Sequence, residues 1–93
     1  MPEPRFEQFI FDDDNENKFL EHGLTPQQVA SMLYEFEFQV RRNRRARSGL
    51  YLLIGRTKSG QCIATPVEPY GQPGSWRPIT AWRCKPSEQA QLG

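Results

Sequence analysis

The sequence contains no long hydrophobic run and no recognisable targeting segment. Its longest apolar stretch, Leu50 to Ile54, is far shorter than the roughly 20 residues that an apolar helix needs to cross a bilayer. The opening residues, Met1 to Arg5, have neither the apolar core of a signal peptide nor a basic leader. These absences predict a cytoplasmic protein that does not span a membrane.

Cysteine and histidine are scarce. The chain has two cysteines, Cys62 and Cys84, and His22 is its single histidine. Two cysteines are too few for the disulfide framework of a small secreted domain, and no pair stands at metal-ligand spacing. The run Asp12 to Asp14 lacks the pattern of a calcium loop and is interpreted as helix-entry charge. We therefore expect reduced thiols, no metal and no cofactor.

What the sequence does contain fits one small folded domain, residues 1–93. A chain of 93 residues holds one core and has no room for a second domain. Its charged fraction of 25% is ordinary for globular proteins, and its aromatic fraction of 12% provides bulky core residues. This composition argues against wholesale disorder.

Charge is divided unevenly along the chain. Residues 1–40 carry nine acidic and two basic side chains, a net charge of −7, whereas residues 41–93 carry ten basic and two acidic side chains, a net charge of +8. One interpretation is a surface that faces a polyanion or an acidic partner. The other is that an acidic helix complements a basic sheet within the same fold.

The acidic half predicts a short strand and a helix. The strand is the aromatic-rich segment from Phe6 to Phe11. The helix runs from about Asn15 to His22, is capped by Asp14, and ends at Gly23, which tolerates the left-handed conformation of a helix stop.

A second helix has the strongest start signal in the chain. Thr25 is its cap, Pro26 occupies its first position, and Gln28 completes a capping box. Its apolar residues follow helical spacing to about Phe36. The alternation from Tyr34 to Val40 favours a strand as the alternative for the end of this stretch.

The basic half predicts strands. They are expected at Leu50 to Arg56, at Gln61 to Val67 after a turn at Lys58 to Gly60, and at Trp76 to Cys84, with a short terminal helix opening at Lys85. Pro66 has no amide donor, which predicts an edge strand or a bulge. The whole pattern predicts an α+β domain in which two N-terminal helices pack on one face of a small antiparallel sheet. The opposite face is then available for a ligand.

The last predicted strand carries candidate catalytic arginines. Period-two geometry places Arg77 and Arg83 on one face, where Arg56 from the hairpin can join them in a cationic patch. Guanidinium groups bind phosphate oxygens through two hydrogen bonds. The alternative is that these arginines pair with the acidic first helix.

His22 is the only candidate for imidazole acid–base chemistry. Metal-independent RNA cleavage needs a base, an acid and cations, and His22, Glu21 and the arginines supply those groups. The alternative is that His22 merely completes its helix terminus. The run from Arg41 to Arg47 is expected to be an exposed loop or helix end that binds phosphates or is simply solvated. The candidate nucleic-acid contacts are Lys18, Arg41, Arg42, Arg44, Arg45 and Arg47.

Three segments follow one another in a recognisable order. They are Asp14 to Val29 with its His22-Gly23 stop, the hairpin strand Tyr51 to Thr57, and the segment Arg77-Pro78-Ile79-Thr80-Ala81. Together they resemble BrnT-type toxins. The resemblance covers about residues 6–88. It implies a RelE-like fold, a ribonuclease that uses no cofactor, and inhibition by a small DNA-binding antitoxin protein.

The resemblance also implies site residues. The matching positions are His22, Arg56 and Arg77, and Lys18 stands where relatives often have a basic residue in the first helix. The family arginine after Ala81 is replaced by Trp82, with Arg83 one place later. A one-residue offset directs a side chain to the other face of a strand, so Arg83 can substitute only where a bulge redirects it.

Two functions follow as hypotheses. The first is a metal-independent ribonuclease toxin of a type II toxin–antitoxin pair, which the His22-Gly23 and Arg77–Ala81 segments favour. The second is a non-catalytic BrnT-like module that binds protein or RNA through its basic half, which Trp82 favours. An enzyme of another kind lacks support, because no nucleophile–base pair or cofactor loop is evident. The oligomeric state is left open.

Overall fold

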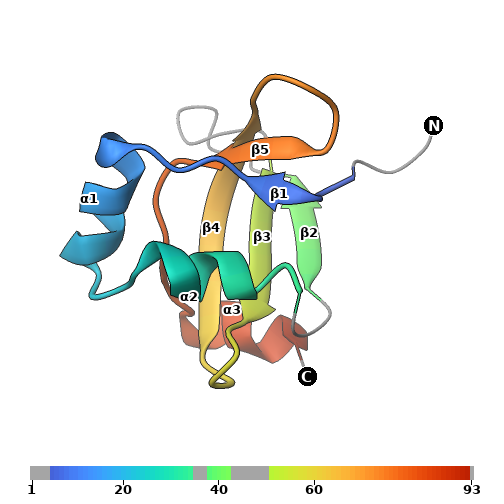
Figure 1. The fold of residues 1–93 in the computed structure, drawn as a ribbon. Coiled ribbons are helices and arrows are strands. Elements are labelled where there is room, and N and C mark those ends of the chain that lie inside the picture. Colours follow the sequence, from blue (N-terminus) through green and yellow to red (C-terminus); the bar gives the residue numbers. More distant parts are fainter. Residues whose placement is uncertain (1–4, 35–37, 43–50, 93) are drawn as a thin grey trace.

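The computed structural model describes residues 5–34, 38–42 and 51–92. The chain forms an α+β domain with two short N-terminal helices, a six-stranded sheet and a short C-terminal helix (Figure 1). None of the described helices is long and apolar enough to cross a membrane. The elements are β1 (Gln8–Phe9), α1 (Asp13–Glu21), α2 (Pro26–Ser31), β2 (Gln39–Arg42), β3 (Tyr51–Arg56), β4 (Cys62–Pro69), β5 (Ser75–Pro78), β6 (Trp82–Arg83), α3 (Pro86–Gln89) and a 3-10 turn (Ala90–Leu92).

The sheet is mixed, so the prediction of an antiparallel sheet is wrong in one respect. Its order is β1-β5-β4-β3-β2, with β6 also paired to β4. All pairs are antiparallel except β1 with β5, in which Gln8 lies opposite Ser75 and Phe9 opposite Trp76. The first strand was expected from its aromatic residues. Its partner could not be read from local pattern, because the two strands are far apart in the sequence.

Both helix starts are fixed by capping boxes. In α1 the cap is Asp12, not the predicted Asp14: the Asp12 carboxylate accepts from the Asn15 amide at 2.9 Å, and the Asn15 side chain accepts from the Asp12 amide at 2.9 Å. Each of three successive aspartates can cap, and the reciprocal bond with Asn15 selects the first. Gly23 ends the helix with a φ of 71°, as predicted.

The predicted capping box of α2 is confirmed. The Gln28 amide nitrogen of the backbone donates to Thr25 Oγ1 at 3.2 Å, and Gln28 Oε1 accepts from the Thr25 backbone at 2.8 Å. The helix ends at Ser31, earlier than predicted, and a turn follows. Strand β2 begins at Gln39. The alternative prediction of a strand from Tyr34 to Val40 therefore holds for residues 39–40, while residues 35–37 lie outside the described residues.

Side chains pack on both faces of the sheet. On one face, α1 and α2 contribute to the main cluster together with residues of β3, β4 and β5; its buried members include Phe19, Val29, Leu53, Ile63 and Trp76. On the other face, a smaller cluster joins Ile54, Cys62 and Ala64 to Trp82 and Leu92 at the C-terminal end. The prediction that this second face is open is therefore wrong where the C-terminal segment covers it.

The predicted last strand is broken in two. Val67 lies opposite Pro78, but Ala64 lies opposite Trp82, so three residues, 79–81, face two residues, 65–66. The extra residue is a bulge, and it inverts the alternation of everything that follows. Arg77 faces Glu68, whereas Arg83 faces Ile63, and these two β4 residues lie on opposite faces of the sheet. The prediction that Arg77 and Arg83 share a face is therefore wrong.

Pro66 stands beside this bulge. It lies within β4, which has neighbours on both sides, so the edge-strand prediction is wrong. Pro66 offers no N–H toward the broken strand, but its carbonyl accepts from the Ile79 amide at 2.9 Å. The interruption of the neighbouring strand thus coincides with the position at which the ladder lacks a donor.

Cys62 and Cys84 form a disulfide, with their Cα atoms 5.4 Å apart. The prediction of two reduced thiols is wrong. The inverted alternation after the bulge brings Cys84 beside Cys62, and the Cys84 amide donates to the Cys62 carbonyl at 3.0 Å. Because this pairing depends on the register of β6, spacing in the sequence could not indicate it.

Candidate nucleic-acid interface

Arg77 is bound by two carboxylates. Its Nε donates to Asp12 Oδ2 at 2.5 Å and its Nη1 contacts Glu68 Oε1 at 3.3 Å, with 18% of its side chain exposed. Hydrogen bonds from Arg77, and then from the Asn15 amide, lower the pKa of Asp12. The bond to Asp12 in turn raises the pKa of Arg77. The alternative prediction, that these arginines pair with the acidic first helix, holds for Arg77, because Asp12 is the cap of that helix.

Arg56 lies at the other end of the sheet. It pairs with Cys62 at the start of β4, whereas Arg77 pairs with Glu68 near its end. Six residues of strand separate these positions, or about 20 Å. Arg56 Nη1 donates to the Gly60 carbonyl at 3.2 Å and so supports the β3–β4 turn. The structure does not bring the predicted cluster of Arg56, Arg77 and Arg83 together.

Arg83 and His22 are the two predicted catalytic residues that do meet. Arg83 Nη1 donates to the backbone carbonyl of His22 at 3.0 Å, and both residues are exposed. A Cβ atom at Gly23 would lie 3.3 Å from the Arg83 guanidinium. The cation therefore closes the C-terminal end of α1, where the helix dipole favours positive charge.

The predicted nucleic-acid contacts occupy different places. Arg41 and Arg42 are exposed as predicted, but they belong to the strand β2 and not to a loop or a helix end. Arg44, Arg45 and Arg47 lie outside the described residues. Lys18 is exposed on α1, which lies on the opposite side of the molecule from β2 in Figure 1.

The acidic and basic halves of the sequence also place their charges in different parts of the folded molecule. Helix α1 contains four acidic residues, and β2 contains two exposed arginines. Figure 1 shows the two elements on opposite sides of the molecule, with β2 at the edge of the sheet. Within the part of the chain that the structure describes, one ion pair, Arg77 with Asp12, joins the acidic half to the basic half. Among the described residues, internal complementarity therefore accounts for Arg77, and no ion pair of Arg41 or Arg42 is found there.

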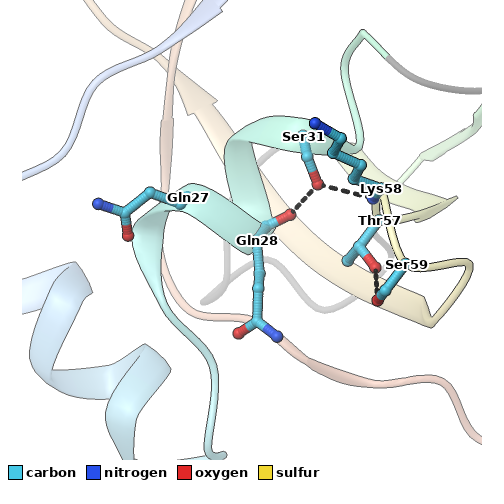
Figure 2. Close-up of a pocket in the computed structure, with 6 residues that line it drawn as sticks. All are labelled: Gln27, Gln28, Ser31, Thr57, Lys58 and Ser59. Atoms are coloured by element: carbon cyan, nitrogen blue, oxygen red, sulfur yellow. Dashed lines mark hydrogen bonds between the residues drawn. The ribbon is translucent and has the colours of Figure 1, made fainter.

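A hollow lies between α2 and the β3–β4 turn (Figure 2); polar residues line it, but most of the surface that they expose in it is apolar. Its volume is about 380 Å³, and its lining consists of Gln27, Gln28, Ser31, Thr57, Lys58 and Ser59. The sequence predicted both the helix start and the turn, but not that they lie against each other. No local signal indicates this contact, because it requires the helix to pack across the sheet.

Over the residues that the structure describes, no group of histidine, cysteine and carboxylate side chains is arranged to hold a metal ion. The fold and its surface define a small mixed-sheet α+β domain with a basic edge strand. Comparison with protein-family models, with curated proteins and with solved structures found no match to this chain.

Proposed function

We propose that the chain is a binding module for single-stranded RNA, with β2 as its main contact. The observation that carries the proposal is the exposure of all four residues of β2 at the edge of the sheet, including Arg41 and Arg42. Arginine binds phosphate bidentately, and basic edges of this kind supply sequence-independent affinity for nucleic acids. The arginines that follow in the sequence add to this charge.

An exposed aromatic ring supports single-stranded RNA as the ligand. Tyr34 lies between α2 and β2 in the chain, and the residue is 68% exposed. Its hydroxyl donates to the Glu7 carbonyl at 3.0 Å, which holds the ring in one position at the surface. Fixed exposed rings stack unpaired bases with little sequence preference.

A second candidate is the ribonuclease toxin with a RelE/BrnT-like fold and a small antitoxin partner. It is supported by the contact between Arg83 and His22, which places a cation beside the only imidazole-bearing residue. Arg77 supports it less, because two carboxylates already occupy its guanidinium. This dispersal of the expected catalytic residues is why binding without cleavage is preferred.

Fluorescence anisotropy with a labelled 12-nucleotide oligouridine tests the binding proposal. We expect affinity to fall steeply with salt, and each arginine that contacts a phosphate to contribute about 0.7 to the slope. Arg42→Ala should weaken binding and lower that slope. Lys85→Ala, which removes the same charge from the exposed start of α3, should leave both unchanged. Equal effects of the two variants would contradict a contact at β2.

Cleavage of the same RNA in EDTA separates the two candidates. We expect intact RNA after incubation with the folded chain. Metal-independent cleavage that is lost in His22→Ala and Arg83→Ala would instead establish the ribonuclease.

A further inference from the structure

The hollow between α2 and the β3–β4 turn is held in shape by hydroxyl groups. Ser31 Oγ donates to the Gln28 carbonyl at 2.8 Å and accepts from the Lys58 amide at 3.1 Å, which ties the turn to the helix (Figure 2). The hydroxyls of Thr57 and Ser59 lie 2.9 Å apart. A pocket of this size whose walls are already bonded can accept a ligand without rearrangement.

Two hydrogen-bond donors in the mainly apolar wall of the hollow are left for a ligand. The Lys58 side chain is exposed, and its ammonium makes no ion pair with any described residue. Gln28 uses its side-chain oxygen in the capping box, which leaves its amide NH₂ for other acceptors. None of the lining residues is acidic. The two donors are suited to an anion that also carries hydrogen-bond acceptors, and the apolar part of the wall is suited to a planar ring.

The hollow and the basic strand lie on the same face of the sheet. Arg42 pairs with Tyr51, which packs against the cluster formed with α1 and α2, so the Arg42 side chain is directed to the α2 face. Lys58 follows Tyr51 by seven residues along β3 and its turn, or about 23 Å. A few nucleotides of an extended strand span that separation. Both sites can therefore contact one RNA chain.

We infer that the hollow binds one nucleotide, with Lys58 on its phosphate and the Gln28 amide as a hydrogen-bond donor to its base. The inference rests on the proposed RNA-binding function in naming the ligand, but the hollow can be tested without RNA. In this inference the contact between α2 and the turn recognises the base of one nucleotide. Strand β2 then supplies the sequence-independent part of the affinity for RNA.

Titration with uridine 5′-monophosphate, followed by the backbone amide signals in NMR, tests the hollow directly. The signals of Gln28, Lys58 and Ser59 should shift, while those of α1 should not. Lys58→Ala should abolish these shifts and Lys85→Ala should retain them. Inorganic phosphate should shift only the signals of the turn. Uridine without phosphate should bind at least about fivefold more weakly than the nucleotide. Absent shifts at the hollow, or equal shifts in Lys58→Ala, would overturn the inference.

Oligouridine binding distinguishes the failure of this inference from the failure of the proposed function. Lys58→Ala should weaken RNA binding about fivefold. Ser31→Ala releases the turn without a change in charge, and it should weaken binding while leaving the salt slope intact. If RNA binds and depends on Arg42 but neither variant has an effect, the hollow is not a nucleotide site and the proposed function stands. If no RNA binds to the parent chain, the proposed function fails, and the mononucleotide titration alone decides the hollow.

Discussion

Asn15 shows how one polar residue can organise the N-terminal region. Its side chain is fully buried, and its Nδ2 donates to the carbonyls of Ile10 and Pro78 at 3.0 and 2.9 Å. Its Oδ1 completes the cap of α1. The residue thus bonds the start of the helix to the end of β5. The sequence placed Asn15 in a polar helix but did not predict that its side chain is buried and bonded in this way.

Replacing Asn15 should therefore be costly. Asn15→Ala leaves two carbonyls without their donor, and we expect the free energy of unfolding to fall by about 3 kcal/mol. Urea denaturation followed by circular dichroism measures this change. Asn17→Ala, at an exposed position of the same helix, should change it by less than about 0.5 kcal/mol. Equal costs for the two variants would mean that the buried bonds contribute little.

The Asp12–Arg77 pair predicts a dependence of stability on pH. Because the pKa of Asp12 is lowered in the folded chain, the pair stabilises the fold above the unfolded pKa, which is about 4, and this contribution is lost as the pH falls through the folded pKa. Asp12→Asn should lower the urea midpoint at about pH 7. The difference from the parent chain should shrink at about pH 3. Asp14→Asn, at an exposed position, should show little of this trend.

At the scale of elements, prediction succeeded where a signal lies within a few residues. The capping box of Thr25 and Gln28 and the turn before Gln61 are contained in segments of four or five residues, and both are present. The bulge at 79–81 and the disulfide were missed because they depend on how β6 aligns with β4. The failed clustering of Arg77 with Arg83 follows from that single inserted residue.

The disulfide should stabilise the C-terminal elements. It links residues 22 apart in the sequence, and a loop of that length corresponds to about 3 kcal/mol of unfolding free energy. Reduction with a phosphine, or the Cys62→Ser and Cys84→Ser double variant, should lower the unfolding free energy by this amount. Hydrogen exchange should increase first in β6 and α3, since α1 and α2 belong to the other cluster. An unchanged urea midpoint would contradict this role.

At the scale of the whole molecule, the acidic helix α1 and the basic strand β2 are far enough apart that we consider only their long-range electrostatic interaction. The molecule measures 31 × 29 × 25 Å, whereas the screening length is about 8 Å at 0.15 M salt and about 30 Å at 0.01 M salt. The Asp13→Asn and Asp14→Asn double variant should therefore strengthen oligouridine binding at about 0.01 M salt. At about 0.15 M salt the change should be less than about twofold. Anisotropy at the two salt concentrations measures the difference.

The candidate site was predictable only in part for the same reason. The imbalance of charge was visible in the sequence, and Arg41 and Arg42 are exposed as expected. The hollow could not be predicted from the sequence, because its two walls, α2 and the turn at Lys58, are brought together by the packing of a helix across the sheet. Local patterns indicate which side chains reach the surface, but not which of them become neighbours.

The pairing of β1 with β5 means that, during translation, β1 is synthesised well before its partner strand. Gln8 leaves the ribosome long before Ser75, its partner 67 residues later, has been translated. At about 5 to 20 residues per second, the first strand waits roughly 3 to 13 s for its neighbour. During this delay Phe9 of β1 has no partner strand. We therefore expect chaperones to bind the β1 segment of the nascent chain until β5 has been translated, and this binding can be measured during translation.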